Sequence, residues 1–177
     1  MASSQKKVLL RTLDDSVLPG YLAVSGFVEA NDGPTIVPLL DLEGRVAPIN
    51  LKTVRWIAFV RDFNLDDRTD PERLTRRTFL ARPRVEGLWV RLTLVGGGVF
   101  EGIAPLDLSF VDGLLKDCGI FLIPPDIRSN TQRIYIPRSG FIDLQILAVI
   151  TSPSKMRPAP PNADSQQSPL FPDAPGR

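Results

Sequence analysis

The chain has 177 residues, of which 43% are hydrophobic and 23% charged, a composition typical of a folded globular protein. Its 21 basic and 20 acidic side chains give a net charge of +1, which excludes a whole-molecule field strong enough to gather nucleic acid or an acidic membrane. Histidine is absent and cysteine occurs once, so the commonest general base and the usual zinc ligand sets are missing. These numbers favour a binding protein over an enzyme.

The first apolar run, which starts at Val8, is too short for the core of a signal peptide, and no stretch approaches the roughly 18 apolar residues of a membrane span. We therefore expect a cytoplasmic protein without membrane insertion. The lone cysteine, Cys118, is followed by Gly119-Ile120-Phe121 and is expected to be a small buried hydrophobe.

Residues 1–7 are expected to be flexible, and residues 8–62 show five short strand patterns. Turn chemistry separates the first two strands at 14–16, and the stretches 31–34 and 43–44 are further turn signals. Gly20, inside the second strand, is expected to mark a bulge or a bend. A short break at 52–53 precedes the last strand. The five predicted strands cover residues 8–13, 17–24, 35–42, 45–51 and 54–60.

Residues 63–87 form a connector that is rich in arginine. Asp70 followed by Pro71 is a helix-start signal, which predicts a short helix over 71–79. Between Arg73 and Arg91 a single acid, Glu86, accompanies six basic side chains: Arg73, Arg76, Arg77, Arg82, Arg84 and Arg91.

Residues 88–151 repeat the strand plan of the first half. Strands are predicted over 89–95, 99–105, 118–123 and 132–136, and a last strand ends near Ile150. Residues 96–98 are three glycines that form a turn, and 137–140 form a break before the last strand. Residues 152–177 contain seven prolines and almost no β-branched side chains, so this tail is expected to be disordered.

The two halves match each other as sequences. Residues 17–21 align with 99–103 at a separation of 82 positions, and the same separation aligns Val8 with Val90 and Leu10 with Leu92. Before the second break, Ile134 and Ile136 are matched with Ile49 and Leu51. Two copies of one pattern in the same order indicate a duplication.

This arrangement of strands, turns and glycines resembles the Sm-like and Src-homology-3-like small β-barrels. The resemblance implies an all-β protein of two tandem five-stranded barrels, one short connecting helix and a disordered C-terminal tail. Because each half alone would be only marginally stable, the barrels are expected to pack together, with the connecting helix in the cleft between them.

Two short motifs in the connector and the second half also resemble the PilZ domain. Arg73 and Arg77 have the spacing R-x-x-x-R, and Asp107, Ser109 and Gly113 approach the pattern [DN]-x-S-x-x-G with one additional residue before the glycine. The resemblance implies binding of cyclic di-GMP, with the arginines on phosphate and guanine. The alternative is that the two arginines form a solvated helix face that pairs with nearby acids.

Two other functions are less consistent with the sequence. An Sm-like RNA-binding role conflicts with the near-neutral charge and the 7% aromatic content, because Trp56 and Trp89 lie in strand patterns that predict core packing. Carboxylate catalysis conflicts with the placement of the acidic clusters in predicted turns, where they cap the backbone; these are Asp14 with Asp15, Asp66 with Asp67, and Asp112 with Asp117.

The sequence therefore predicts a non-enzymatic adaptor or regulatory module with a protein partner. Binding is expected at barrel edges, at the connector through Arg82 and Arg84, and at the loop that contains Asp126 and Arg128. No metal and no cofactor are expected, apart from cyclic di-GMP as an alternative ligand. The partner and the oligomeric state, including a homo-oligomer, stay open.

Overall fold

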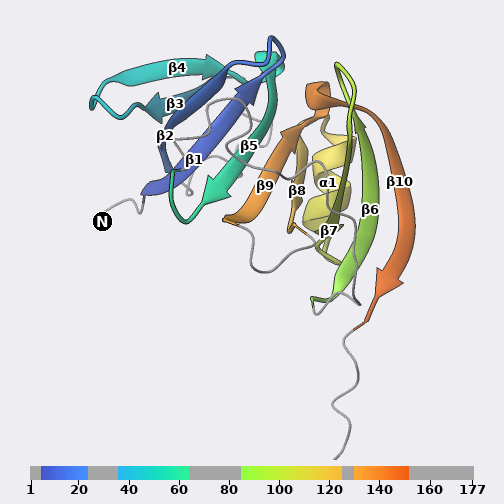
Figure 1. The fold of residues 1–177 in the computed structure, drawn as a ribbon. Helices are drawn as coiled ribbons and strands as arrows, with labels where there is room; N and C mark the ends of the chain where they lie inside the picture. Colours follow the sequence, from blue (N-terminus) through green and yellow to red (C-terminus); the bar gives the residue numbers. More distant parts are fainter. Residues whose placement is uncertain (1–4, 24–35, 64–84, 125–129, 152–177) are drawn as a thin grey trace, which may run out of the picture.

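The computed structural model describes residues 5–23, 36–63, 85–124 and 130–151. These residues form ten strands and one α-helix, which confirms the predicted all-β class (Figure 1). The first half contains β1 (Gln5–Thr12), β2 (Val17–Ala23), β3 (Ile36–Leu40), β4 (Val46–Asn50), the 3-10 helix η1 (Leu51–Thr53) and β5 (Val54–Val60). The second half contains β6 (Gly87–Leu94), β7 (Val99–Ala104), α1 (Leu108–Leu115), β8 (Gly119–Leu122), β9 (Thr131–Pro137), the 3-10 helix η3 (Arg138–Gly140) and β10 (Phe141–Ile150).

The strands form two antiparallel sheets that do not follow the division into halves. One sheet has seven strands in the order β4-β3-β2-β1-β5-β9-β8, and the other has three in the order β10-β6-β7. Strand β5 of the first half pairs with β9 of the second, so one sheet runs through both halves (Figure 1). Within the described residues, the pairing gives two sheets and no closed barrel, unlike the separate barrels that the sequence predicted.

The first hairpins of the two halves have the same register. Val8 lies opposite Gly20 in β1 and β2, and Val90 lies opposite Gly102 in β6 and β7. Both members of the second pair stand 82 positions after those of the first. The turns also agree: the amide of Thr12 donates to the carbonyl of Ser16 as that of Leu94 does to Gly98.

The closing strands agree in register as well. Leu10 lies opposite Ile57 in β1 and β5, and Leu92 lies opposite Leu144 in β6 and β10, where Leu144 stands 87 positions after Ile57. Both ladders contain a register shift at the start of the last strand, just after the 3-10 helix. Strands β2 and β3 of the first half pair at Tyr21 and Leu40. At the equivalent place in the second half, Ile103 forms an isolated bridge with Ile123.

Two details of the sequence interpretation are wrong. The register runs through Gly20 without a shift, so of the two expectations for Gly20, a bulge or a bend, the bulge is wrong; a Cβ there would lie 2.6 Å from the carbonyl oxygen of Leu40. The glycine is required by close approach of β3. Ile49 and Ile136 each stand two positions before the 3-10 helix of their half, so these two residues are equivalent. The sequence analysis had matched Ile49 with Ile134 and Leu51 with Ile136, which is displaced by two positions.

Strand β5 divides the apolar core into two clusters. All seven of its residues are buried. Trp56, Ala58 and Val60 pack in a cluster with residues of the second half, whereas Ile57 and Phe59 pack in the cluster of the first half. Because alternate side chains of a strand point to opposite faces, β5 supplies both clusters at once.

Helix α1 was not predicted, although its signals are present. Asp107 is its N-cap, and Phe110 and Leu114 stand one helical turn apart and pack against the core. The helix predicted over 71–79 lies outside the described residues. Among the helices of the described ranges, none has the length and apolar character needed to cross a membrane.

Candidate interaction surface

The residues predicted to bind a ligand lie partly in α1 and partly outside the described chain. Asp107 precedes the helix, and Ser109 and Gly113 belong to it. The other predicted site residues fall outside the described ranges, and the cyclic di-GMP site stays a prediction; these residues are Arg73, Arg77, Arg82, Arg84, Asp126 and Arg128.

Asp107, Ser109 and Gly113 each have a structural role in α1. The amide of Ser109 donates to Asp107 Oδ1 over 2.9 Å, and the Ser109 hydroxyl donates to the same oxygen. These hydrogen bonds hold the pKa of the Asp107 carboxyl below its usual range, the bond from the Ser109 hydroxyl having the largest effect. A Cβ at Gly113 would collide with the carbonyl oxygen of Gly119, so glycine allows the helix to pack on β8.

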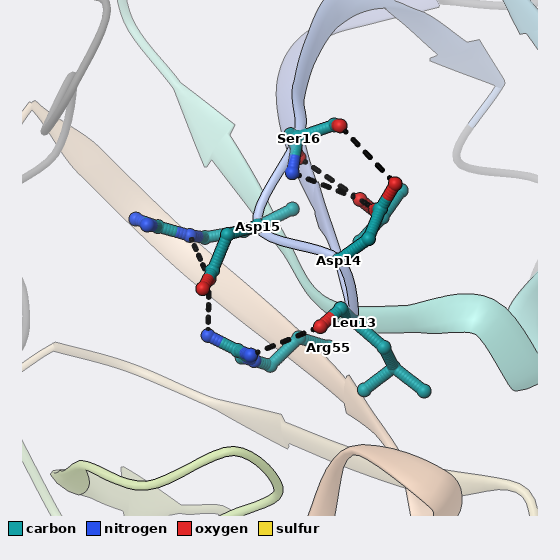
Figure 2. Close-up of polar contacts among 7 residues, drawn as sticks. Leu13, Asp14, Asp15, Ser16 and Arg55 are labelled. Atoms are coloured by element: carbon teal, nitrogen blue, oxygen red, sulfur yellow. Dashed lines mark hydrogen bonds and ion pairs between the residues drawn. The ribbon is translucent and has the colours of Figure 1, made fainter.

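The acidic turn at Asp14 and Asp15 is held by hydrogen bonds from its neighbours (Figure 2). The Thr12 hydroxyl donates to Asp14, and this bond is the main reason why the pKa of the Asp14 carboxyl is lowered. Asp15 Oδ1 accepts from Arg11 Nε over 3.1 Å and from Arg55 Nη1 over 2.5 Å. The turn was correctly predicted. Its two carboxylates are engaged, that of Asp14 by the hydroxyls of Thr12 and Ser16 and that of Asp15 by two arginines.

Arg55 connects this turn to the second half. It lies on β5, is buried, and also donates through Nη2 to the carbonyl of Leu13 over 3.2 Å. A Cβ at Gly96 would lie 2.5 Å from Arg55 Nη2, so the glycine turn between β6 and β7 rests against the guanidinium. The arginine thus holds the first turn of the chain beside the glycine turn of the second half rather than forming an open site.

The buried carboxylate of the second half, Glu101, is also fully engaged. Trp89 Nε1 donates to its Oε2 over 3.1 Å, and Arg91 Nη2 lies 2.7 Å from its Oε1. Trp56 is buried in the core as predicted, whereas Trp89 is half-buried and orients Glu101. Cys118 is half-buried rather than buried, and its carbonyl accepts a bond from the Tyr135 hydroxyl.

Strand β10 exposes apolar side chains along its length. Ile142, Ile146 and Val149 are 69%, 56% and 60% exposed. Phe59 in β5 is the equivalent of Ile146, because Phe59 lies opposite Val8 and Ile146 lies opposite Val90. In contrast to Ile146, Phe59 is only 7% exposed. One side of β10 pairs with β6, and no described strand pairs with the other side (Figure 1).

The difference between β5 and β10 follows from what lies beside them. Beyond β5 lie β9 and then β8, whose Tyr135 and Phe121 belong to the same side of the sheet as Phe59. The rings of Phe59 and Phe121 are 6.1 Å apart, and those of Phe121 and Tyr135 are 4.9 Å apart. Among the described residues, no strand lies on the open side of β10 to cover its apolar side chains. Ile146 and Val149 therefore stay exposed.

A groove beside α1 extends this apolar face. It has a volume of about 670 Å³ and is lined by Leu88 and residues 105–111. Leu88 lies opposite Val149 in the β6–β10 ladder, and directly opposed side chains share one face of a sheet. Leu108 and Val111 are exposed on the helix beside it. We define the interaction surface as the open edge of β10, Leu88 and the exposed apolar side chains of α1.

The sequence reasoning did not find this surface. The apolar runs of β5 and β10 were interpreted alike, as the apolar strand that ends each half, since both are rich in Ile, Leu, Val and Phe. The signal that distinguishes them is the neighbouring strand, which composition does not contain. The sequence analysis predicted binding at barrel edges in general; β10 is an edge strand of the three-stranded sheet.

The comparisons with known proteins give one match. A family model with the description "Family of unknown function (DUF6982)" matches residues 4–148, which extend from the start of β1 into β10. No curated protein and no solved structure matches the chain. The function must therefore be argued from the structure itself.

Replacing Arg55 by methionine tests the junction. Arg55→Met keeps the apolar stem but leaves the Leu13 carbonyl and Asp15 without their buried donor, so the free energy of unfolding should fall by roughly 1.5–3 kcal/mol. The measurement is urea denaturation monitored by Trp fluorescence. Arg11→Ala removes the more exposed of the two arginines from the same carboxylate, with 22% of its side chain exposed against 10% for Arg55, and should cost at most about 1 kcal/mol. Equal losses for the two variants would contradict the role given to Arg55.

Replacing Asp107 tests the cap of α1. Asp107→Ala should lower the urea midpoint, whereas Asp107→Asn should keep most of it, because an amide oxygen still accepts the Ser109 bond. The folded-state pKa of Asp107 is depressed, so its contribution is present above the ordinary carboxyl pKa and is lost as the pH falls through the folded value. The difference between wild type and Asp107→Ala should therefore shrink below about pH 4. A difference that stays constant with pH would contradict the charged cap.

Proposed function

The chain belongs to a family of unknown function (DUF6982), and from this premise we propose that it is a non-enzymatic protein-binding module. Its binding site is the interaction surface, and its partner adds an extended apolar segment to the open edge of β10. The observation that carries the proposal is the ten-residue strand β10, which is apolar, exposed and unpaired on one side within the described residues.

Strand addition is the chemistry that such an edge supports. An edge strand presents unpaired N–H and C=O groups that can pair with another chain. Lysine and proline, which commonly blunt natural edges, are absent from β10, and Asp143 is its one charged residue. The β6–β10 ladder does contain two register shifts, between Phe141 and Asp143 and between Ile146 and Ala148. The groove beside α1 offers apolar contacts for side chains of the added segment.

A duplicated five-stranded unit of the Sm-like or Src-homology-3-like kind would explain why the edge is open. The matching registers and turns of the two halves support this origin. In the first unit, β9 takes the place beside β5. In the second unit, the same place beside β10 is left for a partner.

A binding role is also supported by what the polar groups do. The chain has no histidine, and the carboxylates of Asp14, Asp15, Asp107 and Glu101 serve as caps or arginine partners. Cyclic di-GMP binding and RNA binding stay predictions, because the arginines that would carry the nucleotide site lie outside the described residues.

Site-specific photo-crosslinking in the native cell tests the proposal. A photoreactive benzoyl-phenylalanine at Ile146 should give a discrete adduct of higher mass, because a partner strand at the β10 edge would lie within reach. The same probe at Val46, which is 65% exposed on the β4 edge, is the matched control and should give no such adduct. Mass spectrometry of the adduct identifies the partner.

Two outcomes would contradict the proposal. An absence of adducts at Ile146 would remove the partner, and the same adducts from Ile146 and Val46 would indicate nonspecific contact. The probe is placed at an exposed position, so that failure to fold does not explain a negative result; thermal unfolding of the labelled protein checks this point.

A further inference from the structure

We infer that the strand added to β10 is an amphipathic segment of another polypeptide. It runs antiparallel to β10, covers Leu144 and Ile146 with large apolar side chains, and places a lysine or arginine opposite Asp143 on its other face. The inference rests on the proposed function, since it uses the same edge. It restricts the apolar side chains of the added segment to one face and gives the other face a charge.

The pairing of β5 with β9 shows how the chain itself covers such a strand. Leu144 and Ile146 have the places in β10 that Ile57 and Phe59 have in β5. The correspondence ends at Ile146, because the β6–β10 ladder shifts register between Ile146 and Ala148. Ile57 and Phe59 are buried beside β9, so an equivalent strand beside β10 would bury Leu144 and Ile146.

Strand β9 covers that face of β5 with two large side chains. Tyr135 lies opposite Ile57, and Arg133 lies opposite Phe59. Tyr135 is 6% exposed, and the Arg133 guanidinium carbon lies 3.6 Å from the centroid of an aromatic ring on β8. Opposed side chains of an antiparallel pair are direct neighbours, and burying apolar area against apolar area stabilises the pair. The apolar face of β10 therefore favours large apolar or aromatic side chains at the two corresponding places.

The other face of β10 has a different chemistry from that of β5. Asp143 and Gln145 have the places in β10 that Trp56 and Ala58 have in β5. Trp56 and Ala58 are buried in the core, whereas Asp143 and Gln145 are exposed. Successive side chains of a strand point to opposite faces, so every second residue of the added strand lies on this polar face. The added strand is therefore amphipathic, with apolar side chains on one face only.

Asp143 gives the polar face a charge that the described part of the chain leaves without a cation. Its Oδ2 accepts a hydrogen bond from Gln145 Nε2 over 3.0 Å, and no lysine or arginine of the described ranges forms an ion pair with it. Arg91, which lies opposite Gln145, pairs with Glu101 instead. Opposite charges on opposed residues stabilise a strand pair, and like charges destabilise it. Charge complementarity therefore favours a lysine or arginine opposite Asp143.

Two synthetic peptides test the inference by fluorescence anisotropy with the purified full chain. Each peptide is as long as β10, ten residues, and alternates valine and tyrosine with threonine and a charged residue. The charged residue is lysine in one peptide and glutamate in the other. The lysine peptide should bind at least about threefold more tightly, because it gains an exposed ion pair where the glutamate peptide gains a repulsion. The net charge of the chain, +1, would favour the glutamate peptide instead, so it does not explain such a preference.

Four variants locate the binding and the charge. Asp143→Asn should abolish the preference for lysine, whereas Asp112→Asn, which removes another exposed carboxylate on α1, should keep it. Ile146→Lys places a charge in the apolar contact and should weaken the lysine peptide at least about tenfold. Val46→Lys places the same charge on the β4 edge and should leave binding unchanged. Circular dichroism confirms that the variants keep their strands.

The results separate this inference from the proposed function. Equal affinities for the two peptides, or a lysine preference that Asp143→Asn leaves unchanged, would overturn the charge assigned to the partner. If neither peptide binds at about 1 mM while the photoreactive probe at Ile146 captures a polypeptide, the binding function stands and the partner chemistry is wrong. If neither binding nor capture occurs, both are wrong.

Discussion

The structure depends on the burial of β5 between two other strands. This strand pairs with β1 on one side and β9 on the other, and all seven of its residues are buried. Its alternate side chains enter different core clusters, so the two halves have no independent interiors. A unit of about 60 residues buries too little surface to be very stable alone. Pairing through β5 supplies the missing surface, and at the same junction Arg55 holds the turn of Leu13 and Asp15 while the Gly96 turn of the second half lies against its guanidinium.

The exposed strand β10 is a consequence of the same arrangement. Both β5 and β10 follow a 3-10 helix, pair with the first strand of their half, and begin with the same register shift. The chain provides β9 as the second neighbour of β5 and provides no described neighbour for β10. An apolar strand with one open side favours association with another polypeptide. The proposed binding surface therefore lies where the second half lacks, among the described residues, the neighbour that β9 gives to β5.

The sequence predicted most of the local structure, because turn chemistry and apolar alternation are local signals. The strand over 54–60, the turn at 14–16 and the breaks before β5 and β10 were all predicted correctly. Helix α1 was missed because Asp107 and Ser109 were interpreted as a turn that binds a ligand, although the same residues cap a helix. The β5–β9 pairing could not be predicted, since it joins residues more than 70 positions apart. Burial of β5 and exposure of β10 follow from that pairing, so the proposed interaction surface could not be predicted from the sequence either.

Hydrogen exchange measured for individual amides tests the shared β5–β9 strand pairing most directly. If the halves share one core through β5, the amides of β5, β9 and β6 should exchange only through global unfolding, with equal opening free energies and equal dependence on denaturant. If β6 and β9 exchanged through a lower-energy opening while β1 and β5 stayed protected, the halves would be separate folding units. That result would contradict the account in which the second half completes the first.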